Sequence, residues 1–527
     1  MKKEIILKKV KKVFKSIGTL FINIFKVIRR IIKKLIKATK ELSKKDFGKV
    51  KGIYVVRVFW ILVALFFVGA FFREIFSVDT VNYSVVYKTN ENKLMLLKHN
   101  GESGDEIKLS GEGSANYVMY ANTTNRYVLF VKNDGLYLYD SKSKEETTKL
   151  VSNISDYYKF TEDDKYIVMM DDNNNLYVYN YRGEKEVIDR NIKSVEGLSK
   201  KNIIYIKDGA LYIKGLKAAK KDSIKIVDGI YQARVTTDGK KVYYIDSSRE
   251  LYEYNVSKKK NTKIDTGVSQ MYISEETGKM YYLTSDTNRY YTAYYYDGKN
   301  SEKVSENVSS VLDYDADKEQ LLYLTSEDYY TLYYQKGTKK AQKVDNKFSS
   351  SSIKAYIHED EIYYVNSKNE LKYTKIRGSK LGRIIKVSKN VESELYVTKN
   401  GYVYLSDLDD NSNGNLYIAS GGTARKIDSN VRDLKLKVSN NGKKIYYLKD
   451  FEKNAGTLCV SSGRKGKELA KDIYSYQYVN DKLIYYVKNY SLSGNSGDLY
   501  RYDGNHEKIA SGVYGIATMP NSFKLDK

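Results

Sequence analysis

A run of Asp and Asn residues, DLDDNSNGNLY at 407–417, has the residue types and spacing of a calcium loop. Asp409, Asn411 and Asn413 stand at alternate positions before Gly414, as in the first half of the pattern D-x-[DN]-x-[DN]-G, where alternate oxygens and a sharp glycine turn surround the ion. Ser420 replaces the acid that closes such a loop. An Asn-rich hairpin turn explains the same residues, so calcium is one of two interpretations, and no other cofactor is expected.

Residues for nucleophilic or metal-dependent catalysis are scarce. The three histidines, His99, His358 and His506, are far apart in the sequence, and Cys459 is the only cysteine. Triads and zinc sites need such groups in clusters, and the GxSxG, HExxH and phosphate-loop motifs are missing. We expect a protein that is not an enzyme, with histidines at the surface or in turns and Cys459 in the core of a strand.

Tyrosine, with 54 residues, is the most unusual part of the composition. It is densest in MYYLTSDTNRYYTAYYYDG at 280–298. Successive strand residues point to opposite faces, so paired tyrosines can pack one ring against each neighbouring sheet. Most tyrosines are therefore expected to build walls, while a minority could stack on sugars or peptides. The candidate binding residues are Tyr290, Tyr291, Tyr294, Tyr295 and Tyr296.

The elements that must position these residues recur along the chain. An apolar, Tyr-rich run, a polar turn and a second run with Leu-Tyr return about every 40 residues, eleven times from residue 84. This period predicts an all-β propeller array of about eleven four-stranded repeats. In one repeat VSQMYISEETG is the inner strand, followed by KMYYLTSD, RYYTAYYYDG and KNSEKVSENV.

The two ends of the array predict how it closes. The chain enters on SVVYK, which matches a second strand, and leaves on GVYGIATMP, which matches an inner strand. The last strand is therefore expected to complete the first repeat and leave no free edge. Eleven units exceed a six- or seven-bladed ring, so two propellers are favoured over one large ring. The array is assigned to 83–519 and a tail to 520–527.

A single apolar segment precedes the array. Residues 53–76 include fifteen uncharged positions, VFWILVALFFVGAFF, which is enough with its flanks for one membrane-spanning helix. The preceding region is strongly basic and more than 50 residues long, which favours a signal anchor over a cleaved signal peptide. We expect a single-pass protein with its N-terminus in the cytoplasm, a short stalk at 77–82 and an extracellular C-terminal domain.

The first 52 residues have the pattern of a basic amphipathic helix. They contain 18 Lys or Arg and three acids, and apolar residues recur at steps of three and four. Such a helix binds the surface of an anionic inner leaflet, and a helical dimerisation arm is the alternative. Because most of the net charge of +25 lies here, nucleic acid is not an expected partner. The proposed lipid-facing cations are Lys8, Lys9, Lys12, Lys15, Arg29, Arg30, Lys33 and Lys34.

Two stretches resemble a known family. TTDGKKVYYIDSSRELYEYN at 236–255 and SNNGKKIYYLKD at 439–450 are similar to the TolB-like propeller repeat, and the chain also resembles the anchored, Tyr-rich propellers of low-GC Gram-positive bacteria. The resemblance implies a propeller fold for 83–519 and transfers no catalytic residues. The proline usual before the Asp-Gly turn is missing.

The expected function is a membrane-anchored, non-catalytic binding or scaffolding platform for an extracellular protein or a cell-wall glycan. One alternative is a transmembrane sensor that couples extracellular ligand binding to the cytoplasmic arm. A second alternative is a cell-wall-active enzyme.

Overall fold

In a computed structural model, the chain divides into two compact units, Met1–Thr80 and Val81–Lys527, and everything described below lies in the second. The predicted arm at 1–52, its lipid-facing cations, the helix at 53–76 and the tail at 520–527 lie outside the described residues. Among the residues described, no helix is both long and apolar enough to cross a membrane. The structure describes residues 82–89, 94–99, 106–108, 119–121, 127–132, 135–140, 147–180, 183–218, 223–285, 290–326, 329–349, 351, 353–392, 394–439, 441–480 and 483–517.

The described chain is all-β apart from one short 3-10 helix, η1 (Leu216–Ala218). Its first nineteen strands are β1 (Asn82–Thr89), β2 (Leu94–His99), β3 (Glu106–Lys108), β4 (Met119–Ala121), β5 (Tyr127–Lys132), β6 (Gly135–Asp140), β7 (Thr148–Val151), β8 (Ile154–Phe160), β9 (Tyr166–Asp171), β10 (Leu176–Asn180), β11 (Lys185–Asp189), β12 (Ile192–Leu198), β13 (Asn202–Lys207), β14 (Ala210–Gly215), β15 (Ile224–Asp228), β16 (Ile230–Val235), β17 (Lys241–Asp246), β18 (Leu251–Asn255) and β19 (Lys260–Asp265).

The remaining strands are β20 (Val268–Ile273), β21 (Met280–Ser285), β22 (Tyr291–Tyr296), β23 (Ser301–Asp315), β24 (Gln320–Ser326), β25 (Tyr330–Lys336), β26 (Gln342–Phe348), β27 (Lys354–His358), β28 (Glu361–Val365), β29 (Leu371–Arg377), β30 (Lys380–Leu381), β31 (Ile385–Ser388), β32 (Tyr396–Thr398), β33 (Gly401–Ser406), β34 (Asn413–Ser420), β35 (Thr423–Val438), β36 (Ile445–Glu452), β37 (Ala455–Ser461), β38 (Lys467–Asn480), β39 (Leu483–Ser491), β40 (Ser496–Tyr502) and β41 (His506–Ala517).

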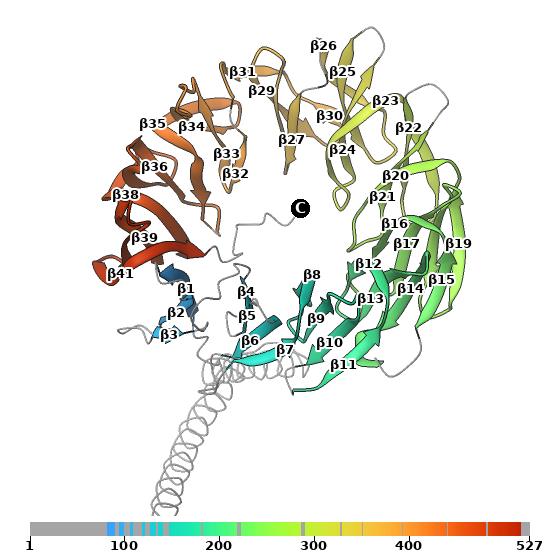
Figure 1. The fold of residues 1–527 in the computed structure, drawn as a ribbon. Helices are drawn as coiled ribbons and strands as arrows, with labels where there is room; N and C mark the ends of the chain where they lie inside the picture. The colour runs from blue at the N-terminus through green and yellow to red at the C-terminus, as the bar shows by residue number, and fades with distance from the viewer. Residues whose placement is uncertain are drawn as a thin grey trace, which may run out of the picture. The chain divides into compact units, whose positions relative to one another are not determined.

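These strands form antiparallel meanders of four, here called blades (Figure 1). β4–β7, β8–β11, β12–β15 and β16–β19 are separate sheets, whereas β23, β35, β38 and β41 are long enough to serve two blades. Val308 in β23, for example, pairs with Tyr291 of the preceding strand β22 and with Thr325 of the following strand β24. The predicted repeat with its inner strand at VSQMYI is thereby confirmed as β20, β21, β22 and the first half of β23.

The chain ends meet in one blade. β41 pairs with β1, and its register joins Val86 to Ala517 and Tyr87 to Ile516. β41 thus supplies the inner strand of the blade that β1, β2 and β3 continue, which confirms the predicted closure. The entropic cost of bringing two such distant segments together grows only slowly with chain length. The pairing of one short strand can therefore keep the ring closed.

The hydrophobic core is a series of layers between consecutive blades. One layer joins β5–β7 to β8–β10, and similar layers join each later blade to the next as far as β39–β41 and β1. Two propellers would need a second layer that closes a ring partway along the chain, and the described residues contain none. The two-propeller prediction is therefore wrong: Figure 1 shows the blades of Val81–Lys527 following one another around a single circle.

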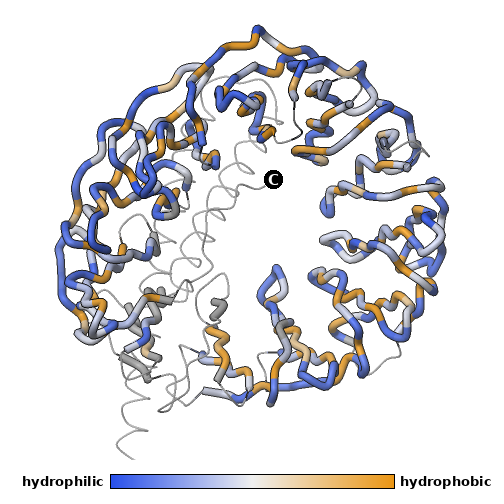
Figure 2. The backbone as a smooth tube through the Cα atoms, turned by 45° about the horizontal axis from the view of Figure 1, so that its top comes forward, coloured by the Kyte–Doolittle hydropathy of each residue, from blue (hydrophilic) through white to orange (hydrophobic). Residues whose placement is uncertain are grey.

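Tyrosine fills these layers. The largest fully buried side chains described are all tyrosines: Tyr87, Tyr205, Tyr243, Tyr244, Tyr281, Tyr282, Tyr323, Tyr334, Tyr363, Tyr364 and Tyr402. On β21, Tyr281 packs toward the following blade and Tyr282 toward the preceding one, as strand alternation requires. Figure 2 shows apolar stretches within the blades and hydrophilic stretches at many turns.

The hydroxyl of a buried tyrosine usually forms a hydrogen bond, and for four of the tyrosines described an aspartate accepts it. In four places the second strand of a blade carries a tyrosine that donates to an aspartate in the strand that serves as the preceding blade's outer strand. We call these pairs Tyr–Asp clamps: Tyr205–Asp189 (2.6 Å), Tyr282–Asp265 (2.6 Å), Tyr364–Asp345 (2.8 Å) and Tyr447–Asp428 (2.9 Å). Each clamp links two blades through a charge-assisted hydrogen bond.

Candidate functional site

A short recurring element sets the start of most inner strands. The element begins with a residue whose φ lies between 51° and 69°. The next residue is an Ile or a Val, which we call the anchor. The positive-φ residues are Asn153, Asn191, Gly229, Gly267, Asn307, Asn390, Asn430, Asp472 and Gly512. Most anchors are fully buried, including Val268, Val308 and Ile473. Asn, Asp and Gly are the residue types that tolerate this backbone conformation.

Backbone hydrogen bonds fasten this element to a neighbouring hairpin. The N–H of the anchor Val268 donates to the carbonyl of Arg249, 2.8 Å away in the turn between β17 and β18. The anchor Ile192 donates in the same way to Asn174, which lies in the turn between β9 and β10. The loops on this side of successive blades therefore hold one another in place.

The residue directly after the anchor lies at a break in strand register. The pairing of β16 with β17 shifts between Ile230 and Gln232, so Tyr231 is the bulged residue. Bulges re-aim a side chain away from the sheet pattern. Equivalent breaks follow seven of the other anchors, whereas the anchor Val391 forms an isolated bridge with Ser406. The eight residues at this position, named the rim residues, are Ser155, Lys193, Tyr231, Ser269, Ser309, Arg432, Tyr474 and Tyr514.

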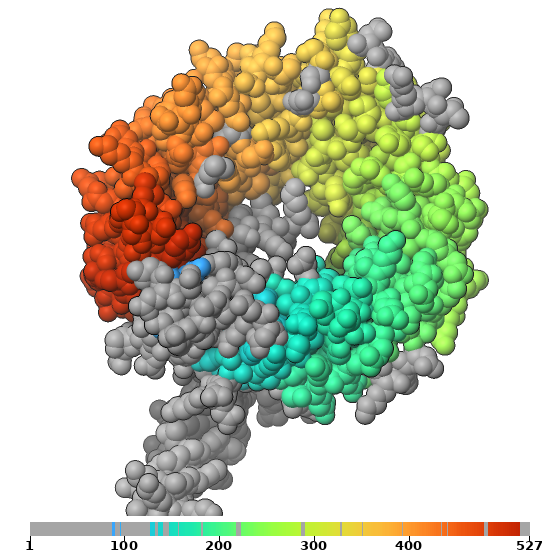
Figure 3. All heavy atoms as spheres, in the orientation of Figure 1, coloured from blue at the N-terminus to red at the C-terminus, as the bar shows by residue number. Residues whose placement is uncertain are grey.

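Three rim residues are tyrosines that the blades do not bury. Tyr231 is 55% exposed and Tyr514 is 46% exposed, whereas the tyrosines of the core layers are covered. Tyr474 lies flat on Tyr490 of β39, with ring centroids 3.8 Å apart. The rim thus presents aromatic faces to solvent, in contrast to the walls between the blades. The hollow beside the inner strands is visible in the space-filling view (Figure 3).

A pocket of about 330 Å³ opens beside Tyr231, between the inner strands β16 and β20. Its lining is aromatic and amide, without a charged side chain: Tyr231, Gln232, Gln270, Met271 and Tyr272. Gln232 Oε1 accepts the N–H of Met271 at 3.3 Å, and the Tyr272 hydroxyl donates to Gln270 Oε1 at 2.7 Å. These bonds position both amides while leaving their NH₂ groups as donors.

Tyr272 closes one side of this pocket. Its ring meets Tyr314 of the next inner strand edge to face, with centroids 5.2 Å apart. Burial and the neighbouring phenols of Tyr314 and Tyr291 raise the pKa of Tyr272 to about 12. Its hydroxyl therefore stays protonated and remains a hydrogen-bond donor at physiological pH.

Arg249 covers part of the exposed tyrosine. The centre of its guanidinium lies 3.7 Å from the centroid of the Tyr231 ring, a cation–π contact. In the part of the chain that the structure describes, Arg249 forms no ion pair. A positive charge is thus held over the ring of Tyr231, which lines the pocket, while Arg249 itself is not one of the lining residues.

The tyrosines predicted as binding residues mostly belong to the wall. Tyr295 and Tyr296 are 4% and 7% exposed and pack into the layers on opposite sides of β22. Tyr294 stacks on Tyr282 at 5.2 Å, Tyr291 packs against the next blade, and the Tyr290 hydroxyl reaches Ser326 Oγ at 3.5 Å. Tyr290, Tyr291 and Tyr294 are half-buried, and they do not line the pocket at Tyr231. Their role as contact residues remains a prediction.

The predicted calcium loop forms the turn between β33 and β34. Asp409 Oδ1 accepts the backbone N–H groups of Asn411 (2.9 Å) and Asn413 (2.7 Å), and Asp409 Oδ2 accepts the Asn413 amide at 3.2 Å. Asp171 accepts the same two hydrogen bonds from Asn175 in the turn between β9 and β10. This hydrogen-bond pattern is therefore a feature of the hairpin turn. No cluster of three or more metal-ligating side chains occurs among the described residues. Calcium binding by Asp409, Asn411 and Asn413 stays a prediction.

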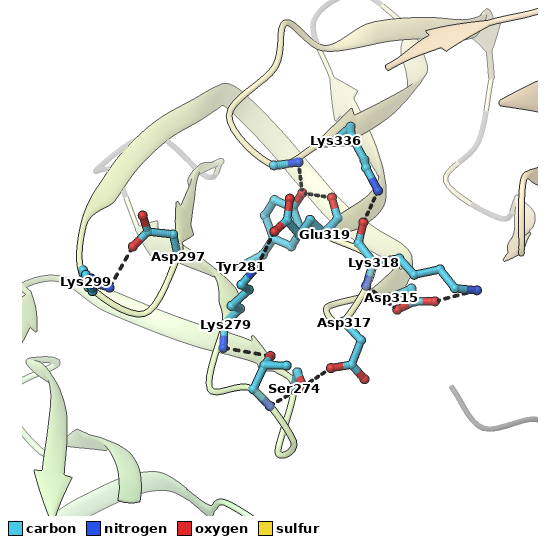
Figure 4. A network of polar contacts seen from close by, with 12 residues as sticks. Ser274, Lys279, Tyr281, Asp297, Lys299, Asp315, Asp317, Lys318, Glu319 and Lys336 are labelled. Atoms are coloured by element: carbon cyan, nitrogen blue, oxygen red, sulfur yellow. Dashed lines mark hydrogen bonds and ion pairs between the residues drawn. The ribbon is translucent and has the colours of Figure 1, made fainter. Parts of the chain in front are cut away.

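A polar network away from the pocket connects two neighbouring blades. In the network of Figure 4, Lys279 pairs with Glu319 and Ser274 donates to Asp317. The Tyr281 hydroxyl donates to the carbonyl of Glu319 at 2.6 Å and accepts the N–H of Gly337 at 2.9 Å. These contacts tie the blade of β20–β23 to the blade of β23–β26.

The remaining predicted residues have structural surroundings. Cys459 is buried on β37, as predicted, and burial raises the pKa of its thiol to about 12. His358 lies edge to face against Tyr402, and His506 Nδ1 is 2.8 Å from the Tyr486 hydroxyl.

The rim itself was missed by sequence reasoning. Its signal is present, as Asn, Gly or Asp before Ile or Val at intervals of about 40 residues, for example NI at 191, GI at 229 and GV at 267. The residue that follows has no shared type, so only the backbone bulge reveals that Lys193, Tyr231 and Ser269 occupy one position.

The sequence matches no protein-family model and no curated protein. Among solved structures, a eukaryotic initiation factor is 12% identical with a TM-score of 0.42, over 84% of this chain and 100% of that chain. The β-propeller domain of the Trilobed protease from Pyrococcus furiosus is 14% identical with a TM-score of 0.25, over 60% and 97%. TolB from Acinetobacter baumannii is 13% identical with a TM-score of 0.23, over 50% and 64%. The assignment of this chain to the propeller fold therefore depends on its own strand pairing.

Proposed function

We propose that this protein is a membrane-anchored, non-catalytic platform that binds a saccharide chain outside the cell through the pocket at Tyr231. The observation that carries the proposal is the exposed Tyr231 ring beside the amides of Gln232 and Gln270. Sugars bind where an aromatic face covers their C–H surface and a few polar groups orient their hydroxyls. The alternatives of a sensor and a wall enzyme have no comparable support.

The anchor and the orientation belong to the same proposal. The helix at 53–76 and the basic arm would hold the propeller at the outer surface, with Lys8, Lys9 and the other cations of the arm on the inner leaflet. Protease treatment of intact cells would cleave the propeller if this orientation holds. Protection of residues 82–517 would contradict it.

The binding test uses the full-length protein in nanodiscs of neutral lipid and a panel of defined oligosaccharides. Replacing Tyr231 with Ala is expected to weaken binding about tenfold or more, because losing a central aromatic contact residue costs about 2 kcal/mol or more. Tyr231→Phe should retain most of the affinity, since the ring face remains.

Tyr329 offers a matched control for this substitution. It is 58% exposed and lies outside the pocket, so Tyr329→Ala removes an equally exposed tyrosine without touching the site. Equal affinities for the parent, Tyr231→Ala and Tyr329→Ala proteins, or no binding of any saccharide by the parent, would refute the proposed function.

A further inference from the structure

We infer that the saccharide bound at Tyr231 is anionic and that Arg249 pairs with its acidic group. This inference rests on the proposed function and adds the chemical class of the ligand. It starts from a guanidinium without an ion pair, held 3.7 Å from the centroid of an exposed ring that also borders the pocket. A saccharide bound beside Tyr231 would bring an acidic substituent to that charge where the substituent extends past the edge of the ring.

The acids nearest in sequence to Arg249 are already engaged. Asp246 Oδ1 accepts the N–H groups of Ser248 and Glu250, at 2.9 and 2.8 Å, and so closes the turn. Glu250 pairs with Lys263 through one oxygen and accepts the Tyr252 hydroxyl at 2.6 Å through the other. Neither carboxylate lies within ion-pair distance of the guanidinium, which therefore keeps its donors for a ligand.

The location of Arg249 is held by the backbone. Its residue has a φ of 63°, its N–H donates to the Asp246 carbonyl at 3.1 Å, and its carbonyl accepts the anchor Val268. The side chain is thus attached to a turn that the next blade fastens. A preorganised guanidinium binds carboxylate or phosphate with little further loss of conformational entropy.

The surroundings contain no competing negative charge at the ligand. The five residues that line the pocket are uncharged, and Lys193, the rim residue of the neighbouring inner strand β12, is basic. The hydroxyls of a neutral sugar would be served by Gln232 and Gln270 alone. The extra cation favours a uronic acid or a sugar phosphate, two sources of the same anionic chemistry.

The test compares three probes on the full-length protein in neutral nanodiscs by isothermal titration at low and high salt. The probes are a galacturonic acid tetramer, the same tetramer with its carboxyl groups methyl-esterified, and a galactose tetramer carrying phosphate groups. The parent protein is expected to bind the acid or the phosphate about tenfold more tightly than the ester, with a difference that shrinks at high salt. The anionic probe whose affinity exceeds that of the ester by the larger factor shows whether the ligand carries a carboxylate or a phosphate.

Two arginine variants isolate the charge. Arg249→Gln should lower affinity for the anionic probe about tenfold and leave binding of the ester in place, while Arg249→Lys should retain part of the preference. Arg383→Gln, which removes an exposed arginine elsewhere, serves as the control and should match the parent. Circular dichroism checks that each variant is folded.

The outcomes separate the two proposals. Equal binding of ester and anions by the parent, or an Arg249→Gln variant that keeps the preference, overturns the inference while saccharide binding stands. Failure of the parent to bind any of the three probes overturns the inference, and failure to bind any saccharide of the oligosaccharide panel overturns the proposed function as well.

Discussion

At the scale of the residue, tyrosine combines a large buried ring with a hydroxyl that must find a partner. Tyr447 is fully buried and donates to Asp428, whose other oxygen accepts from Lys449 at 3.1 Å. Burial, followed by the hydrogen bond to Asp428, raises the pKa of Tyr447, so the phenol stays a donor. Tyr402 is equally buried but has a hydroxyl without a partner. The two tyrosines therefore differ in what their hydroxyl contributes.

Tyr447→Phe is expected to destabilise the clamp, because it leaves the largely buried Asp428 carboxylate short of a donor. A hydrogen bond to a charged group is worth about 1.5–3 kcal/mol, so hydrogen-exchange protection of amides in β36 should fall about tenfold or more. Tyr402→Phe is the matched control and should preserve or slightly raise protection in β33. Similar effects of the two substitutions would show that the Tyr–Asp clamp contributes nothing specific.

At the scale of the element, the positive-φ residue and the bulge decide which side chains leave the wall. Gly229 has a φ of 66°, and a Cβ there would lie 2.5 Å from Ser247 Oγ. Gly267 has nearly the same φ, 69°, but a Cβ there would meet nothing within 4 Å. Asn occupies the equivalent position at Asn153 and Asn191, so the conformation itself admits Asn.

Gly229→Asn is therefore expected to cost about 1–3 kcal/mol through the clash with Ser247 and to weaken saccharide binding at Tyr231. Gly267→Asn should cost less than Gly229→Asn, because both positions have a positive φ but only the Cβ at Gly229 meets a neighbouring side chain. Thermal unfolding and titration with the galacturonic acid tetramer measure the two effects. Adding Ser247→Gly to Gly229→Asn should restore stability, and a double variant no better than the single one would contradict the steric explanation.

At the scale of the whole molecule, the ring depends on one pairing between distant segments. β41 contributes Val513, which is fully buried, to the core layer that also contains Tyr87 of β1. Without the C-terminal half of β41, that layer loses a side and β1 becomes an unpaired sheet edge.

A chain that ends at Ser511 should accordingly unfold at lower temperature and aggregate more readily than the full-length protein. A chain that ends at Ala517 keeps every described strand and is the matched control. Light scattering during thermal unfolding measures both properties. Equal unfolding temperatures for the chains ending at Ser511 and at Ala517 would show that the closure does not hold the ring.

Local patterns in the sequence determine much of this protein. The period of about 40 residues, the tyrosine pairs and the Asn and Gly turns are enough to predict all-β blades, the strands around Val268 and the meeting of β41 with β1, because each depends on neighbours in sequence or on a strand missing from one repeat. Tertiary structure alone decided that eleven blades form one series and not two, since that depends on small rotations between packed sheets.

The same division holds for the candidate site. The sequence marks Tyr290–Tyr296 by its density of tyrosine, yet density is what a packed wall requires, and Tyr295 and Tyr296 are covered by neighbouring blades. Tyr231 is a single tyrosine in its strand, and the Gly-Ile pair before it does not show that its ring is exposed. A one-residue register shift in β16 exposes its ring, and the turn of the same blade brings Arg249 onto it. Exposure depends on which atoms the other blades cover, and only the assembled fold determines that.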